Sequence, residues 1–112
     1  MLIEQNRWNE YLAELTRQAE GYEVSIEILS GELGDQTEVR RARLAELAYD
    51  PREGIAVAVS DPAGHQELLR HVIAAPTRLE ATDEAGIPGT LLVEEPTGVK
   101  TLVRLAPPAS AG

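Results

Sequence analysis

The sequence predicts an α+β domain in which one N-terminal amphipathic helix packs on a curved antiparallel sheet of about six or seven strands. A barrel-like curl is one form that such a sheet could take. Three observations predict this class. Apolar residues repeat at helical spacing near the N-terminus, short segments of alternating apolar and polar residues follow, and clusters of turn residues separate these segments.

Length and composition limit what the molecule can be. A chain of 112 residues fits one domain with its own core, which we expect to span residues 1–105. Residues 106–112 contain little that could be buried and are expected to form a disordered tail. Because the chain has no cysteine, disulfides, thiol nucleophiles and thiolate zinc sites are excluded, and a reducing cytoplasm suits the protein.

The charge of the chain bears on its partners. It has 19 acidic and 10 basic residues and a formal net charge of −9. This charge repels phosphate backbones and anionic membranes, so we expect neither nucleic acid nor a membrane as a partner. The N-terminal residues MLIEQNRWNE lack the basic start and apolar run of a signal peptide, and no stretch approaches the ~20 apolar residues of a membrane span. These features predict a soluble cytoplasmic protein.

An amphipathic helix is predicted between Asn6 and Gly21. Its apolar stripe repeats at spacings of three and four residues and consists of Trp8, Leu12, Leu15 and Ala19, widened by Tyr11. Asn6 is a suitable N-cap and Gly21 a suitable C′ residue, so both ends of the predicted helix have appropriate chemistry.

The chain after this helix is predicted to form strands divided by turns. Apolar and polar residues alternate over 22–28, and larger apolar residues alternate with alanine over 55–59. Two further strands are predicted over 90–95 and 99–105. Residues 37–49 form a polar, arginine-bearing run whose apolar spacing fits neither the helical nor the strand period, and we expect an irregular or bulged strand there. The loop Pro96-Thr97-Gly98 predicts a hairpin between the last two strands.

Residues 61–82 allow two interpretations. In the first, Asp61 caps a helix that ends before Pro76, because a residue preceding proline avoids helical backbone angles. In the second, residues 67–74 form a strand and Pro76 marks a bend into another strand over 77–82, since proline lacks the N–H donor that a central strand needs. The short strands on either side favour the extended interpretation.

Four stretches of sequence add a resemblance to a known family. They are WNEYL from Trp8, EGYEVSIEILSGELG from Glu20, HVIAAPTRLEATDE from His71 and TLVRL from Thr101. In this order they resemble a bacterial family of small domains of unknown function, the one numbered fifty-three thirty-five, over residues 8–105. The resemblance implies a helix followed by strands, with residues 71–84 extended. It implies no activity, catalytic residue or cofactor.

The two histidines, His65 and His71, are the first candidates for a functional site. Six residues of extended chain would separate them by roughly 20 Å, so they cannot share a metal ion within one strand. Asp61, His65 and Glu67 could bind a divalent ion, but three such residues on a loop are common by chance. His71 is expected to be half-buried on one side of its strand, without a nucleophile in reach. No catalytic residue, metal or cofactor is therefore predicted.

Charged residues offer two more candidates. Arg40, Arg41 and Arg43 form the one basic patch of an acidic chain, and its functional interpretation is a nucleic-acid interface. In an extended strand Arg40 points away from the other two, so we expect these arginines to pair with carboxylates and to keep a sheet edge from pairing with other sheets. Glu23 and Glu27 would lie about 13 Å apart, wider than the ~5–9.5 Å carboxylate pairs of glycosidases. Both are expected to be solvated.

Strands with apolar residues on both faces carry the functional hypothesis. They are marked by Leu29 and by the runs 91–93 and 102–105. A two-sided strand must be covered on both sides, and the helix covers only one. The first hypothesis is therefore a non-catalytic binding or accessory module that acts through a sheet face or edge and could form a homodimer. The alternative is a small enzyme or ligand-binding domain with a pocket near His71 and Arg78.

Overall fold

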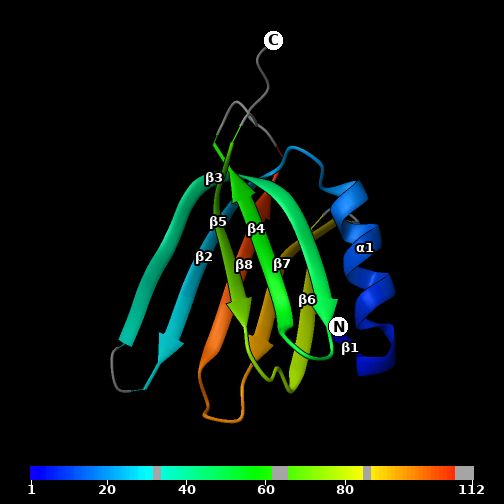
Figure 1. Ribbon diagram of the computed structural model, residues 1–112, viewed down its shortest axis with the longest axis vertical. Coiled ribbons are helices and arrows are strands. Elements are labelled where there is room, and N and C mark those ends of the chain that lie inside the picture. Colours follow the sequence, from blue (N-terminus) through cyan, green and yellow to red (C-terminus); the bar gives the residue numbers. More distant parts are fainter. Residues whose placement is uncertain (32–33, 62–65, 85–86, 108–112) are drawn as a thin grey trace.

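The computed structural model describes residues 1–31, 34–61, 66–84 and 87–107. Over these ranges an N-terminal helix accompanies an antiparallel sheet (Figure 1), which confirms the predicted α+β class. A short strand β1 (Leu2–Ile3) and a 3-10 turn (Gln5–Arg7) precede helix α1 (Trp8–Gln18). The other strands are β2 (Glu23–Ser30), β3 (Gly34–Asp50), β4 (Gly54–Ser60), β5 (Glu67–Ile73), β6 (Arg78–Glu84), β7 (Ile87–Glu94) and β8 (Lys100–Ala106).

The sheet differs from the predicted one in strand number and in closure. It has eight strands in the order β1-β6-β7-β8-β2-β3-β4-β5, and neighbouring strands are antiparallel. The additional strand β1 has two residues, too few to show an alternating pattern. The sheet is open, with β1 and β5 at its ends, so the barrel-like form is wrong. Helix α1 packs along β3 and fills one side of the core, where a barrel would need paired strands (Figure 1).

The region with two interpretations is extended in its described part. Residues 67–73 form β5 and residues 78–84 form β6, so the prediction of two strands with a bend at Pro76 is confirmed. Ala75, just before the proline, has a φ of 50°, which turns the chain out of the strand. The bend carries the chain from β5 at one end of the sheet to β6 beside the other end.

The predicted N-cap of the helix is wrong. Asn6 lies within the 3-10 turn, where Arg7 N donates to Glu4 O at 2.9 Å, and Arg7 is the N-cap without a side-chain cap bond. The helical backbone of the turn prevents Asn6 from adopting the extended conformation that an N-cap requires. At the other end Ala19 is the C-cap. Gly21, with a φ of 79°, supplies the left-handed residue that leads into β2.

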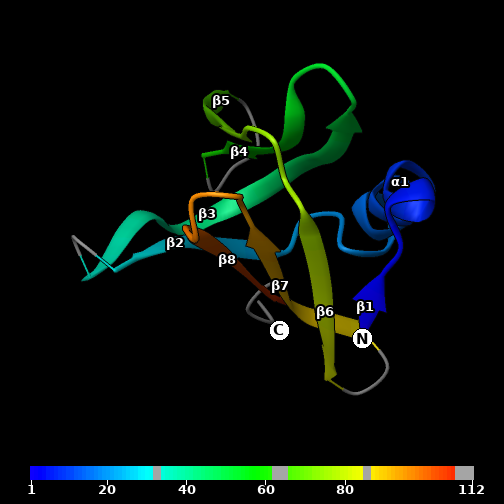
Figure 2. The ribbon, with the colours of Figure 1, turned by 90° about the horizontal axis from the view of Figure 1, so that it is seen from below.

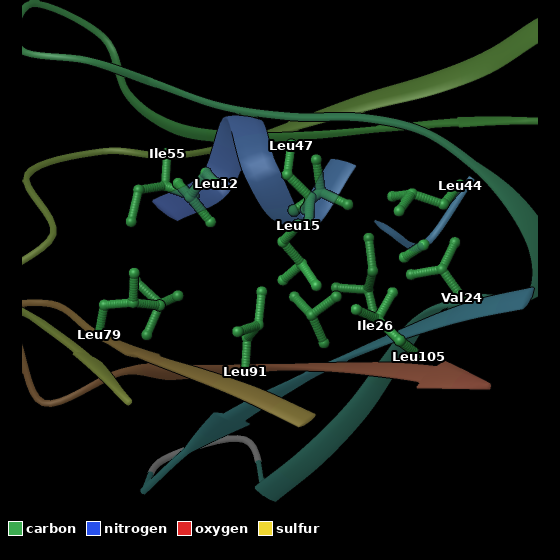
Figure 3. Packing of buried hydrophobic residues seen from close by; sticks show 14 of the residues in the cluster. Leu12, Leu15, Val24, Ile26, Leu44, Leu47, Ile55, Leu79, Leu91 and Leu105 are labelled. Atoms are coloured by element: carbon green, nitrogen blue, oxygen red, sulfur yellow. The ribbon is translucent and has the colours of Figure 1, made fainter. Parts of the chain in front are cut away.

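Two layers of strands enclose the core. Figure 1 shows β4, β5 and the C-terminal half of β3 in front of β2, β8, β7 and β6, and Figure 2 shows the same layers edge-on. Figure 3 shows the side chains that meet between them, with Leu12 and Leu15 from α1, Leu47 and Ile55 from the front layer, and Leu79, Leu91, Ile26 and Leu105 from the rear layer. Trp8, only 1% exposed, donates from Nε1 to Ile3 O at 2.9 Å and contacts Tyr49 edge-on.

Strand β3 passes from one layer to the other. Its pairing with β2 shifts register between Val24 and Glu27, its pairing with β4 shifts between Leu44 and Glu46, and Arg41 has a φ of 52°. Such bulges bend a strand and increase its twist. The prediction of an irregular strand over residues 37–49 is therefore confirmed, and the irregularity lets one strand belong to both layers.

The strands of the rear layer are apolar on both faces, as their sequences indicate. Leu91, Val93, Val103 and Leu105 are buried on the core side. On the outer side Leu92 lies opposite Leu102, and both are half-buried. Ion pairs flank this outer leucine pair, among them Lys100–Glu94 and Arg104–Glu27. The curl of the sheet thus covers one face of these strands.

Candidate interaction edge

The free edges of the sheet are the surfaces where this fold can add a strand. An edge strand carries a row of backbone N–H and C=O groups that another chain can pair with. Strand β1 closes one end with two residues, Leu2 and Ile3, which pair with β6 at Glu80 and Leu79. An edge this short offers little to pair with. Beyond it β6 continues over Thr82, Asp83 and Glu84, where two of the three residues are acidic and the pairing with β7 shifts register between Thr82 and Asp83, and both features disfavour an added strand.

A second edge runs along the C-terminal half of β3, where pairing with β2 has ended at Arg43. Helix α1 covers this edge through Thr16, which stands beside the apolar stripe of the helix. The backbone N of Leu47 donates to Thr16 Oγ1 at 3.0 Å, and the same hydroxyl lies 3.0 Å from Leu47 O. Closer to the start of this half, Leu44 N donates to Tyr22 O at 2.8 Å. The backbone groups of this edge are therefore partly satisfied within the chain.

The third edge is the N-terminal half of β3, on the side that β4 does not reach. Its sequence from Gly34 to Arg41, GDQTEVRR, is mostly polar and charged, and the bulge at Arg41 distorts it. Charged residues and bulges are two of the means by which natural proteins protect sheet edges from pairing.

Strand β5 is the remaining edge, and it is seven residues long. Figure 2 shows it at the rim of its layer, beyond β4. Apart from two residues at the N-terminus, the large apolar side chains that the described residues expose are both on this strand: Leu69 is 37% and Val72 is 40% exposed. The one charged side chain between them, Arg70, forms an ion pair of 3.3 Å with Glu46.

The outward backbone groups of β5 can be assigned from the strand pairing. In an antiparallel strand the N–H and C=O of one residue point to the same side, and this side alternates from residue to residue. The backbone N–H and C=O of Leu47 point toward α1 and away from β4. Val57 lies opposite Leu47 on β4, so this pair is not hydrogen-bonded and the N–H and C=O of Val57 point toward β5. Val57 pairs with His71. The backbone groups of Arg70 and Val72 consequently face away from the sheet.

The two predicted ligand-binding residues are on different faces of the sheet. His71 shares the core-side face of β5 with Leu69 and Ile73 and is half-buried. Arg78 lies on the outer face of β6, where its Nε is 3.0 Å from Glu80 and 3.9 Å from Glu94. The hydrogen bond and charge of Glu80 raise the pKa of Arg78, and the charge of Glu94 adds to the effect.

Shallow depressions occur elsewhere on the surface. One of ≈ 260 Å³ lies between α1 and β3, and another of ≈ 290 Å³ is lined by Gly21, Arg43, Ser60 and their neighbours. A third of ≈ 400 Å³ lies beside the loop between β7 and β8. His71 and Arg78 line none of these three. The structure therefore does not bring the two residues together in any of these depressions.

The other candidate residues are dispersed. His65, of the group Asp61, His65 and Glu67, lies outside the described residues. Among the described residues no three metal-ligating side chains form a cluster. Arg41 is exposed and lies 3.9 Å from Glu23, whereas the half-buried Arg43 lines a depression. The side chain of Arg40 is not among those that the structure describes.

Two further predictions concern the C-terminal residues and a possible membrane span. Of the predicted tail, Ala106 still belongs to β8, and residues 108–112 lie outside the described ranges. Within those ranges no helix has both the length and the apolar character needed to cross a membrane.

Sequence reasoning did not find Thr16, Leu69 or Val72 as functional positions. The only signal for Thr16 is its place four residues after Leu12, beside the apolar stripe. Leu69 and Val72 look like ordinary strand residues, because an edge strand is defined by strand order and not by local sequence.

Comparison with known proteins agrees with the predicted resemblance. The chain matches, over residues 1–112, the model of a family described as "Family of unknown function (DUF5335)", and it belongs to that family. It is 28% identical over 105 residues to an uncharacterized protein of Aquifex aeolicus (strain VF5), an alignment that covers 94% of this chain and 90% of the relative. No solved structure gives a significant match.

Proposed function

We propose that this domain is a non-catalytic protein-binding module that accepts an extended segment of a partner polypeptide as an added strand along β5. The observation that carries the proposal is the contrast between its edges. The edge at β1 is short, and the edges along β3 are charged or covered by α1. Strand β5 offers outward backbone groups at Arg70 and Val72 together with exposed apolar side chains.

Strand addition suits this surface because it draws on two separate contributions. Main-chain hydrogen bonds supply affinity for any extended segment, and alternate side chains supply specificity. A segment paired with β5 would place side chains beside Arg70 and Val72 on the outer face, and beside Leu69 and His71 on the core side. The formal charge of −9 disfavours an acidic segment, so the preferred partner segment is neutral or basic and rich in β-branched residues.

A proline substitution on β5 separates strand addition from other kinds of binding. The N–H of Val72 faces outward, so Val72→Pro removes a donor for an added strand without removing a bond to β4. Proline is tolerated on edge strands in this orientation. Val72→Thr is the matched control, since it keeps both the N–H and the β-branched shape.

The experiment is a selection from a random heptapeptide display library on the wild-type protein, with counter-selection on Val72→Pro. The expected result is enrichment of β-prone, non-acidic sequences that bind wild type and Val72→Thr and lose binding to Val72→Pro. A selection that enriches no peptide, or only peptides that bind all three proteins equally, would overturn the proposal.

A further inference from the structure

We infer that the segment accepted by β5 is β5 of a second copy of this chain, paired antiparallel about a two-fold axis at His71. The inference rests on the proposed function and specifies its partner. A second copy brings to the contact the same open edge, with the same outward backbone groups and exposed side chains. An interface of this kind is isologous, so every contact between two residues occurs twice, once from each copy.

Geometry restricts the register of such a pair. A two-fold axis that relates two antiparallel strands is perpendicular to the sheet and lies midway between the strands. One residue of β5 therefore faces its own equivalent across the axis. The outward groups of Arg70 and Val72 must also face outward groups of the partner strand. Only axes at Arg70, His71 or Val72 satisfy both conditions near the middle of β5.

Charge and chain path select the axis at His71. An axis at Arg70 places two residues of like charge directly opposite each other, which destabilises a strand pair. An axis at Val72 moves the overlap toward Ala75, where a φ of 50° ends the extended conformation. With the axis at His71, Arg70 of each copy lies opposite Val72 of the other, and the outward groups of these residues can form four hydrogen bonds.

This register also covers the exposed apolar surface of β5. On the outer face Val72, which is 40% exposed in the single chain, lies opposite Arg70 of the other copy. On the core side Leu69, 37% exposed, lies opposite Ile73 of the other copy. The ion pair between Arg70 and Glu46 uses neither outward backbone groups nor the facing strand, so it can persist in the pair.

The size and charge of the contact determine how the association responds to conditions. One strand edge is a small interface, in the range of weak and transient associations. Each copy also has a formal charge of −9, so like charges oppose the encounter. Added salt screens this repulsion. Self-association is therefore expected to increase with protein concentration and with ionic strength, whereas contacts held by ion pairs would weaken with salt.

The absence of cysteine allows the register to be mapped with single-cysteine variants. Facing residues of a non-hydrogen-bonded antiparallel pair have Cα atoms about 4.5 Å apart, within the ~4.4–6.8 Å range of disulfides. His71→Cys would place its two thiols at this position. Val72→Cys is the control, because it is more exposed but would lie one residue from the axis. It would therefore be two residues along the strand from its equivalent, about 8 Å away.

The first measurement follows covalent dimer in a glutathione redox buffer. His71→Cys is expected to form several-fold more dimer than Val72→Cys, and adding Val72→Pro to His71→Cys should remove the difference. The second measurement is sedimentation equilibrium on the unlinked proteins. The mass of wild type and Val72→Thr should rise with concentration and salt from 12.1 kDa toward twice that value, while Val72→Pro stays monomeric.

Two outcomes would overturn the inference. One is equal or greater cross-linking of Val72→Cys, which places the axis elsewhere. The other is a wild type that remains monomeric at about millimolar concentration in high salt. If the monomer nevertheless selects peptides that Val72→Pro loses, strand addition at β5 stands and only the identity of the partner is wrong. If no peptide is selected either, both proposals fall.

Discussion

The contact between Thr16 and Leu47 can be tested by replacing Thr16 with valine. The substitution keeps the branched shape of the side chain and removes its hydroxyl. Leu47 N then loses the acceptor that lies 3.0 Å away. The two carbonyl oxygens near the hydroxyl, Leu12 O and Leu47 O, are less affected, because one hydroxyl proton can be donated to only one of them at a time. Leu12 O is also placed to accept the ordinary helical hydrogen bond from the backbone N–H of residue 16.

The expected loss of stability is that of one hydrogen bond, with part of the cost of leaving a strand donor unpaired. Such a bond contributes about 0.5–1.5 kcal/mol, and an unsatisfied buried donor costs about 1–3 kcal/mol. Because Thr16 is half-buried, water reaches part of the site, and we expect a loss of about 1–2 kcal/mol. An unfolding entropy of about 2.1 cal/mol/K per residue corresponds to about 4 °C per kcal/mol for this chain. The melting temperature should fall by about 4–9 °C.

The assay is thermal unfolding followed by far-ultraviolet circular dichroism, together with urea unfolding at one temperature. Thr16→Ser is the control that keeps the hydroxyl and loses a methyl group. Valine should lower stability more than serine does. If valine leaves stability unchanged, or if serine lowers it more than valine, the hydroxyl does not satisfy the edge of β3 and this account of how α1 covers that edge is refuted.

Three further substitutions test other parts of the fold. Gly54→Ala places a Cβ 2.0 Å from Ile73 O at a φ of 116° and should cost about 2–5 kcal/mol in urea unfolding. Gly98→Ala also has a positive φ, 89°, but its Cβ meets no atom within 4 Å, so it should cost only the ~1–2 kcal/mol of that backbone conformation. Trp8→Phe removes a buried ring segment and its N–H donor, and circular dichroism should show a loss of about 1–3 kcal/mol. Arg78→Gln should leave the melting temperature unchanged, because exposed ion pairs contribute little; a fall of several degrees would contradict this.

Local sequence patterns predicted the elements whose stabilisation is itself local or repetitive. The strand over residues 55–59 and the hairpin around residues 96–98 were predicted from alternation and turn residues, and Glu95 N donates to Val99 O at 3.0 Å across that hairpin. The bulged strand was predicted because the arginine-bearing run fits no single period. Every residue of β4 is buried, so the apolar run that predicts this strand also places it in the core.

The features that escaped prediction depend on contacts between distant parts of the chain. Strand β1 has only two residues, and its partners Leu79 and Glu80 are far along the sequence. Asn6 was a reasonable cap by composition, yet the 3-10 turn that includes it is held by the burial of Trp8 against Ile3. The edge position of β5 follows from strand order, which the apolar pattern of a single chain does not determine.

The open edge at β5 is a consequence of where the chain goes next. An open antiparallel sheet has two end strands, and in this chain one of them, β1, has only two residues. At β5 the turn at Ala75 and Pro76 removes the chain from its edge and carries it to β6 beside the opposite end. No described segment then returns to β5. Because a second copy supplies a complementary strand without any additional sequence, pairing of two β5 strands is the simplest way for this fold to complete its sheet.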